Sequence, residues 1–191
     1  MSEIVICDTN AVIHLAIICP EIIKNPNEKY RLVIHPIVKQ EIQKLLLVPE
    51  KEKRLGEILK FIANEVMADT KIGLPPKDRE IRLHRRIQLL ESGLDPRLLS
   101  SGSSHQDRCF LIIAYTKEAQ LLTNEKTLHS LGNAFLGEDR VFRTSKVLEM
   151  LVKHELATQD SIQTGLKNLK KYEERVHDDC IQKLKEIGFQ I

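Results

Sequence analysis

The chain has 191 residues, of which 42% are hydrophobic and 29% are charged, as is typical of a globular domain with a full core. The net charge of +2 is too small to indicate a nucleic-acid-binding protein by itself, so any basic surface must be local. The sequence contains neither eighteen consecutive apolar residues nor a signal-peptide pattern, because Glu3 and Asp8 interrupt the first apolar run. We therefore expect a cytoplasmic protein with no membrane partner.

The cysteines are scattered along the chain. No CxxC pair occurs, and no Cys/His spacing in the sequence is typical of a zinc site. Cys7 and Cys109 lie in apolar runs and are interpreted as small core residues. The pattern therefore indicates a reducing compartment and predicts no zinc site. The four cysteines are Cys7, Cys19, Cys109 and Cys180.

A short apolar strand is predicted at residues 4–7, and Asp8, Thr9 and Asn10 follow it directly. Four apolar residues in a row are typical of a strand buried on both faces at the centre of a parallel sheet. Ligands of such sheets bind at the carboxyl ends of the strands. Asp8 is therefore either the N-cap of a helix that begins near Ala11 or a catalytic acid, and this stretch alone supports both equally.

Three further strands are predicted at residues 31–35, 119–122 and 140–143, with helical patterns between them. Strands that alternate with helices at this spacing favour right-handed βαβ units. We therefore expect an α/β fold of three layers, in which a central parallel sheet of four to five strands is flanked by helices.

Glu41 lies on the apolar face of a predicted helix that begins at Pro36, a residue suited to a first helical turn. Ile37 and Leu45 lie one turn to either side of it. A carboxylate on such a face needs a partner or loses free energy by desolvation. The alternative, which this stretch alone favours, is that Glu41 lies at the edge of the stripe and reaches water.

Residues 49–92 predict a pair of charged amphipathic helices, inserted between the second and third strands. The second helix carries Arg82, Arg85 and Arg86 within the densest basic cluster of the chain. Such a run is usually a solvated helix face. The functional alternative is that these arginines hold RNA phosphates, which requires donors but no base contacts.

Two further carboxylates occupy positions similar to that of Asp8. Asp107 opens a predicted helix after the loop at 93–106, on the same face as Phe110, which the helical spacing predicts to be buried. The simpler interpretation of Asp107 is N-capping. Glu125 follows the third strand through Thr123 and Asn124, which repeats the pattern at the start of the chain.

The last part of the chain, residues 145–191, is predicted to be a helical extension of the domain at 1–144. Apolar stripes predict one helix around 147–152 and two more after Thr158, which is a plausible N-cap. These helices either pack back on the core or cover an oligomer or partner surface.

Asp8 and Glu125 are predicted at one edge of the sheet, with Glu41 and Asp107 on inward helix faces near it. Four carboxylates at short range cannot all remain ionised and unpaired. Oxygen ligands without His or Cys select a hard cation, so the sequence predicts a Mg²⁺ or Mn²⁺ site. Such a site is suited to the hydrolysis of a phosphodiester.

In this order and spacing, the motifs resemble the PIN-domain family, which includes metal-dependent ribonucleases such as the VapC-type toxins. The resemblance covers about residues 4–144. It implies a PIN-like fold and the activity of a metal-dependent endoribonuclease. The motifs that carry it are the strand with Asp8-Thr9-Asn10, Pro36 with Glu41, Asp107 opening a helix with Ile113-Ala114, and LLTNEKTL at 121–128.

Carried over by residue, the resemblance implies a catalytic, metal-binding cluster of Asp8, Glu41, Asp107 and Glu125. The family's last acid is usually Asp, whereas this chain has Glu125, whose extra methylene lengthens its reach. Asn124 is the alternative polar group at that edge. The supporting residues that the resemblance implies are Asn10 and Thr123.

The expected partner is therefore an RNA substrate, with an antitoxin, another protein or a second copy of the chain left open. The alternative function is a non-enzymatic PIN-like scaffold that acts in protein interaction or RNA binding. A metal-dependent phosphatase or DNA nuclease is less well supported, because no Asp-x-Asp follows the first strand and no glycine-rich phosphate loop occurs.

Overall fold

A computed structural model describes residues 3–24, 30–95, 102–174 and 178–189. The described part is an α/β fold built on a four-stranded, all-parallel sheet with strand order β2-β1-β3-β4. This sheet confirms the α/β class and the parallel arrangement expected from the sequence. Its strands are β1 (Glu3–Cys7), β2 (Tyr30–Val33), β3 (Gln120–Leu122) and β4 (Val141–Phe142).

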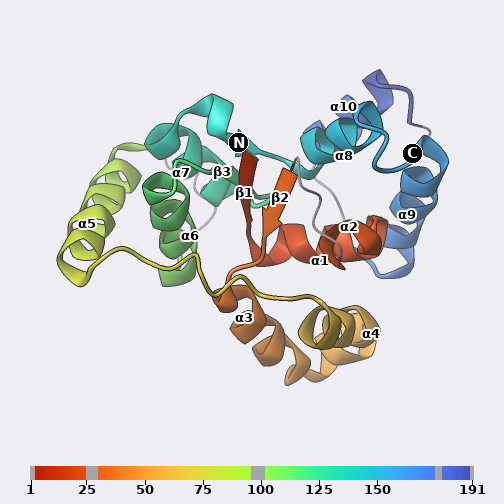
Figure 1. Cartoon of the computed structure of the whole chain (residues 1–191), viewed down its shortest axis with the longest axis horizontal. Coiled ribbons are helices and arrows are strands. Elements are labelled where there is room, and N and C mark those ends of the chain that lie inside the picture. Colours follow the sequence, from red (N-terminus) through yellow and green to blue (C-terminus); the bar gives the residue numbers. More distant parts are fainter. Residues whose placement is uncertain (1–2, 25–29, 96–101, 175–177, 190–191) are drawn as a thin grey trace.

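Helices flank the sheet on both sides (Figure 1). On one side, α6 (His105–Thr116) packs against β1 and β3, α7 (Lys126–Leu136) packs against β4, and α5 (Lys77–Gly93) packs on these two helices from outside. A second group, on the other side, contains α1 (Thr9–Ile18), α2 (Pro20–Lys24), α8 (Thr144–Lys153), α9 (Gln159–Lys171) and α10 (Asp178–Glu186). The helix pair α3 (Pro36–Leu46) and α4 (Pro49–Glu65) packs together and against α1, and a 3₁₀ turn, η2 (Glu138–Arg140), precedes β4.

All four predicted strands are present, with bounds that differ by one or two residues: β1 and β2 begin one residue earlier than predicted, whereas β3 and β4 are shorter. The second strand stops at Val33, because His35 instead caps α3 by accepting a hydrogen bond at Nδ1 from the Ile37 amide (3.2 Å). The fourth strand has two residues, because Arg140 belongs to the 3₁₀ turn and Arg143 to the N-cap of α8. The loop predicted over 93–106 lies partly outside the described residues, at 96–101.

The core is centred on β1 and α1. Val5, Ile6 and Cys7 are buried on β1, and every residue of α1 from Ala11 to Ile18 is buried. A helix that is apolar all round must be covered on all sides. In the described ranges, no helix has both the length and the apolarity that crossing a membrane requires.

The apolar stripe of the C-terminal helix α9 packs against α1. Ile162, Leu166 and Leu169 are buried, and Thr158 caps the helix by accepting a hydrogen bond from the Ser161 amide (3.1 Å). Of the two alternatives left open by the sequence, the structure therefore supports packing on the core for this helix.

Gly165 is the point of closest approach between α9 and α1. A Cβ added at Gly165 would lie 2.1 Å from the carbonyl oxygen of Ile18 and 2.5 Å from its Cα. Because these are backbone atoms, relief requires the two helices to move apart.

We therefore expect Gly165→Ala to lower the free energy of unfolding by about 2 kcal/mol or more, because the overpacking outweighs the gain in helix propensity. Urea unfolding measures the change. Gly56→Ala on α4 is the matched control, since the three atoms nearest to its added Cβ all belong to the exposed Glu52 side chain, the closest at 3.3 Å. The control should be neutral or stabilising by up to about 1 kcal/mol, and equal losses in the two variants would contradict the predicted contact.

Candidate functional site

A pocket of about 320 Å³ lies at the carboxyl ends of β1 and β3. The side chains around it come from the start of α1, from α3, from the first turn of α6 and from the residue before α7. All four acids predicted from the sequence line this pocket. The complete lining is Asp8, Thr9, Asn10, Glu41, Lys44, Leu45, Gln106, Asp107, Phe110 and Glu125.

Asp8 is buried, with 4% of its surface exposed, and it is both a helix cap and a pocket acid. Its Oδ1 accepts a hydrogen bond from the Ala11 amide (2.6 Å), and its side chain is also hydrogen-bonded to Thr123. Burial raises the pKa of Asp8 to about 6, and the charge of Asp107 adds to this, whereas the two hydrogen bonds and His14 lower it. The two interpretations of Asp8 are therefore compatible.

Glu41 is half-buried and has the partner that its position on the apolar face requires. The Thr9 hydroxyl donates a hydrogen bond to its carboxylate. Burial raises the pKa of Glu41, as does the charge of Asp107, while the Thr9 hydrogen bond and Lys44 lower it. The bond ties α3 to the start of α1, so Glu41 is held at the pocket rather than at the outer edge of the stripe.

Asp107 belongs to a capping box at the start of α6. Its Oδ2 accepts a hydrogen bond from the Ser104 amide (2.8 Å), and its own amide donates to the Ser104 hydroxyl (3.0 Å). The N-cap residue is Ser104, and Asp107 is the third residue of α6, so the N-capping interpretation of Asp107 is wrong in position although its carboxylate takes part in the cap. Asp107 also lines the pocket, and its negative charge raises the pKa of Asp8, Glu41 and Glu125.

Glu125 completes the acidic cluster. Its amide donates a hydrogen bond to the Thr123 hydroxyl (3.1 Å), so Thr123 contacts both Asp8 and Glu125. Burial raises the pKa of Glu125 to about 7, and the charges of Asp107 and Asp8 contribute to the same shift. Thr123, which was predicted to support the acids, is fully buried and is hydrogen-bonded to the two acids that follow β1 and β3.

Asn124 does not replace Glu125 at the pocket. Its amide nitrogen lies 2.6 Å from the Thr144 hydroxyl and 2.9 Å from Nδ1 of His14, and its oxygen accepts from the Thr144 amide (3.1 Å). The alternative that Asn124 supplies the polar group at this edge is therefore wrong. Its side chain is used to join the end of β3 to α1 and α8.

The donor set of the pocket fits a hard divalent cation. In the described part of the chain, the lining contains four carboxylates but one cationic side chain, that of the exposed Lys44. Three of the carboxylates have raised pKa values, to which neighbouring carboxylates contribute. A cation among oxygen ligands would remove this repulsion, and such ligands suit Mg²⁺ or Mn²⁺ better than zinc. Asn10, exposed at the pocket, adds a neutral amide.

The predicted phosphate-binding arginines lie elsewhere, on α5. Arg82, Arg85 and Arg86 are exposed and do not line the pocket. The guanidinium carbon of Arg86 lies 5.6 Å from the ring centroid of Tyr115 and 5.2 Å from that of Phe135. Arg86 therefore packs on aromatic rings, whereas Arg82 and Arg85 are the better candidates for phosphate contacts.

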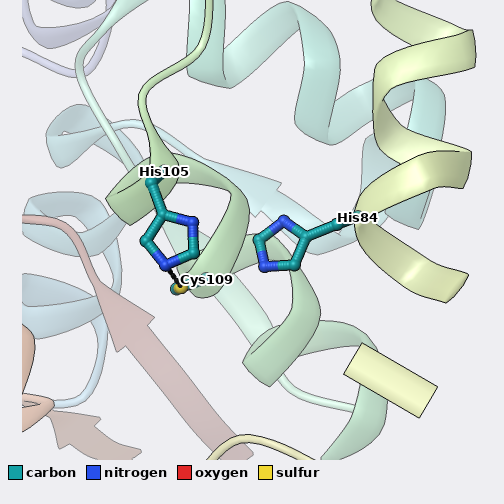
Figure 2. Close-up of side chains that lie close together, drawn as sticks. All are labelled: His84, His105 and Cys109. Carbon is teal, nitrogen blue, oxygen red and sulfur yellow. Dashed lines mark hydrogen bonds between the residues drawn. The ribbon is translucent and has the colours of Figure 1, made fainter. Parts of the chain in front are cut away.

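A second group of candidate metal ligands was not predicted from the sequence. His84 on α5 faces His105 and Cys109 on α6 (Figure 2). The expectation that Cys109 is simply a core residue is incomplete, because its buried sulfur lies 3.6 Å from Nε2 of His105. A sequence signal exists in the four-residue spacing of His105 and Cys109, but the third ligand comes from another helix.

Comparison of the chain with protein-family models, curated proteins and solved structures returns no match. The resemblance to the PIN-domain family thus rests on the residues described above.

The raised pKa of Asp8 predicts a pH-dependent loss of stability in the metal-free protein. The folded state binds the proton of the Asp8 carboxyl more tightly than the unfolded chain does, so protonation of Asp8 stabilises the fold. This stabilisation is complete below about pH 4 and disappears as the pH rises through about 6. Asp8→Asn keeps a capping side chain without the charge. We expect the stability of Asp8→Asn relative to wild type to rise by roughly 3 kcal/mol between about pH 4 and pH 7.

Urea unfolding across this pH range, in the presence of a chelator, measures the difference. Asp139→Asn removes an exposed acid and serves as the control, which should follow the wild-type pH dependence. A constant difference between Asp8→Asn and wild type at all pH values would contradict the desolvation of Asp8.

Proposed function

We propose that this protein is a divalent-metal-dependent ribonuclease of the PIN type, which hydrolyses RNA phosphodiester bonds with Mg²⁺ or Mn²⁺. The observation that carries the proposal is the convergence of Asp8, Glu41, Asp107 and Glu125 on one pocket at the carboxyl edge of the sheet. Isolated carboxylates on a surface are common. Four around one pocket, with burial and mutual charge raising the pKa of three of them, are better explained by a bound cation.

Each acid has a distinct role in this proposal. Asp8 and Asp107 hold the metal ion directly, and Glu41 either holds it or orients the attacking water. Glu125 completes the outer part of the site. The bound ion supplies positive charge for the scissile phosphate and lowers the pKa of a water molecule.

The remaining polar groups fix these acids. The Thr123 side chain is hydrogen-bonded to Asp8, and its hydroxyl accepts a hydrogen bond from the Glu125 amide. One buried side chain therefore orients two acids. Thr9 holds Glu41 in the same way. Asn10, which is exposed at the pocket, is placed to donate a hydrogen bond to a substrate phosphate or to a water molecule. RNA rather than DNA is proposed from the family resemblance alone.

The test is cleavage of a labelled structured RNA and of its DNA counterpart with Mn²⁺, Mg²⁺ or EDTA. We expect wild type to cut RNA in a metal-dependent manner and Asp8→Asn to lose at least about 100-fold in rate, because an essential metal ligand is removed. Asp139→Asn, which removes an acid that does not line the pocket, should retain full activity.

Unchanged cleavage by Asp8→Asn would exclude the proposed active site. No cleavage by folded wild-type protein, together with no Mn²⁺ binding by calorimetry, would favour the alternative of a PIN-like scaffold. Mn²⁺ binding that is lost in Asp107→Asn, without cleavage, would instead direct the search to a specific RNA target or to an inhibiting partner such as an antitoxin.

The arginines of α5 give a separate prediction. Replacing both Arg82 and Arg85 with Ala should weaken RNA binding by the inactive Asp8→Asn protein. The slope of log affinity against log salt concentration should become shallower by an amount that corresponds to roughly one to two phosphate contacts.

Arg86→Ala should lower the free energy of unfolding by about 1 kcal/mol, because its stacking on Tyr115 and Phe135 is lost.

Fluorescence anisotropy with labelled RNA at several salt concentrations measures the binding. The matched control replaces Lys167 and Lys170, two exposed cations on α9, with Ala. An equal loss of binding in both double variants would show that only net charge matters, and that α5 is not the RNA surface.

A further inference from the structure

Helices α5 and α6 present two pairs of metal-ligating side chains to one another. Glu80 and His84 are four residues apart on α5, with Oε1 of Glu80 and Nε2 of His84 separated by 3.6 Å. His105 and Cys109 are four residues apart on α6, with Nε2 and Sγ also separated by 3.6 Å. The two imidazole rings stack across the gap, with centroids 5.0 Å apart (Figure 2).

Three of the four ligand atoms, those of the two histidines and the cysteine, are already close enough to share an ion. One ligating atom each from His84, His105 and Cys109 lies within 4.8 Å of the other two. In a tetrahedral zinc site, nitrogen and sulfur ligands lie about 3.3 to 3.8 Å apart. Binding thus requires a contraction of roughly 1 Å and a turn of the rings out of their stack, which side-chain rotation provides.

A second observation points to a missing partner. Nε2 of His84 is buried and makes no hydrogen bond within the described residues, since the Glu80 oxygen 3.6 Å away is too distant. Glu80 itself is buried, with 7% of its surface exposed. Lys77 donates a hydrogen bond to its Oε1 (3.4 Å) from a side chain that is 76% exposed. A simple ring stack leaves Nε2 of His84 without a hydrogen bond, whereas a cation would bind this nitrogen and the Glu80 carboxylate together.

We propose that Glu80, His84, His105 and Cys109 bind a single Zn²⁺ ion that joins α5 to α6. Two nitrogens, one sulfur and one carboxylate oxygen form the mixed set that zinc takes in four-coordinate sites, and they differ from the all-oxygen set of the acidic pocket. The Zn–S bond forms as the Cys109 thiol releases its proton to solvent, with no change of oxidation state. The exposed His105 gives the ion a route of entry.

The position of the site suggests what the ion does. His105 and Cys109 lie on either side of Asp107 along the first turns of α6, and Asp107 lines the acidic pocket. Zinc bound to α5 and to this turn fixes the start of α6 against its neighbour. The inference goes beyond the proposed nuclease function, because the ligand set stands whether or not the acidic pocket is catalytic.

Cobalt is the probe for this site, since tetrahedral Co²⁺ is coloured and reports thiolate ligation. We expect one equivalent of Co²⁺ added to the reduced, chelator-stripped full chain to give visible bands of a tetrahedral ion and a near-ultraviolet thiolate charge-transfer band. One equivalent of Zn²⁺ should abolish both. His84→Ala and Cys109→Ser should each weaken zinc affinity by at least about 100-fold, because even outer partners of metal ligands contribute 10- to 100-fold.

Two controls separate this site from other metal binding. Cys19→Ser removes another free thiol and should leave the bands unchanged. Asp8→Asn should also keep them, because none of the described residues that line the acidic pocket contains sulfur; loss of nuclease activity and loss of zinc binding are therefore distinguishable. His105→Ala replaces an exposed side chain, so it tests the site with little risk to the fold.

The expected result is a stoichiometric cobalt spectrum with thiolate ligation that His105→Ala, His84→Ala and Cys109→Ser each lose. A zinc-induced rise in the melting temperature of wild type, absent in folded His105→Ala, would support the same conclusion. No thiolate band in wild type, or an unchanged spectrum in His84→Ala and His105→Ala, would overturn the proposal.

Discussion

The buried carboxylate of Asp8 is the group on which the candidate site depends. The Asp8 amide donates a hydrogen bond to the Leu122 carbonyl (3.0 Å), so the β1–β3 ladder continues into the pocket. The Asp8 side chain accepts a hydrogen bond from the Ala11 amide and is hydrogen-bonded to Thr123. A charge in such a place is costly unless hydrogen bonds or a cation balance it. The fold supplies hydrogen bonds, and the neighbouring acids increase the need for a cation.

A second polar network connects the C-terminal part of the chain to this site. The buried His14 of α1 contacts Asn124 and lies 3.4 Å from Glu174, which also pairs with Arg54 of α4 (2.6 Å). Burial raises the pKa of Glu174, but the hydrogen bond and charge of His14, with Arg54, bring it below the ordinary value. This network fixes α1, whose first residues line the pocket, so the C-terminal region contributes to the site without providing an acid.

The start of α6 serves two proposed metal sites of different chemistry. Asp107 lines the pocket of oxygen ligands, whereas His105 and Cys109 face α5 with nitrogen and sulfur. Hard ions such as Mg²⁺ and Mn²⁺ prefer oxygen ligands, whereas the borderline-soft Zn²⁺ prefers nitrogen and sulfur ligands. Two ions on one helical turn would fix both its position and its orientation, which is a requirement for placing a catalytic acid accurately.

Local chain order determined much of this molecule from the sequence alone. Neighbouring residues alone determine the apolar strands, the proline that opens α3 and the capping pattern before Ser161, so the positions of these features were predictable. The placing of acids after β1 and β3 was predictable for the same reason. The strand order and the orientation of Asn124 away from the pocket depend on contacts between distant segments, and only the tertiary structure decided them. The cluster of His84, His105 and Cys109 remained hidden for the same reason, because helix packing rather than sequence spacing brings its members together.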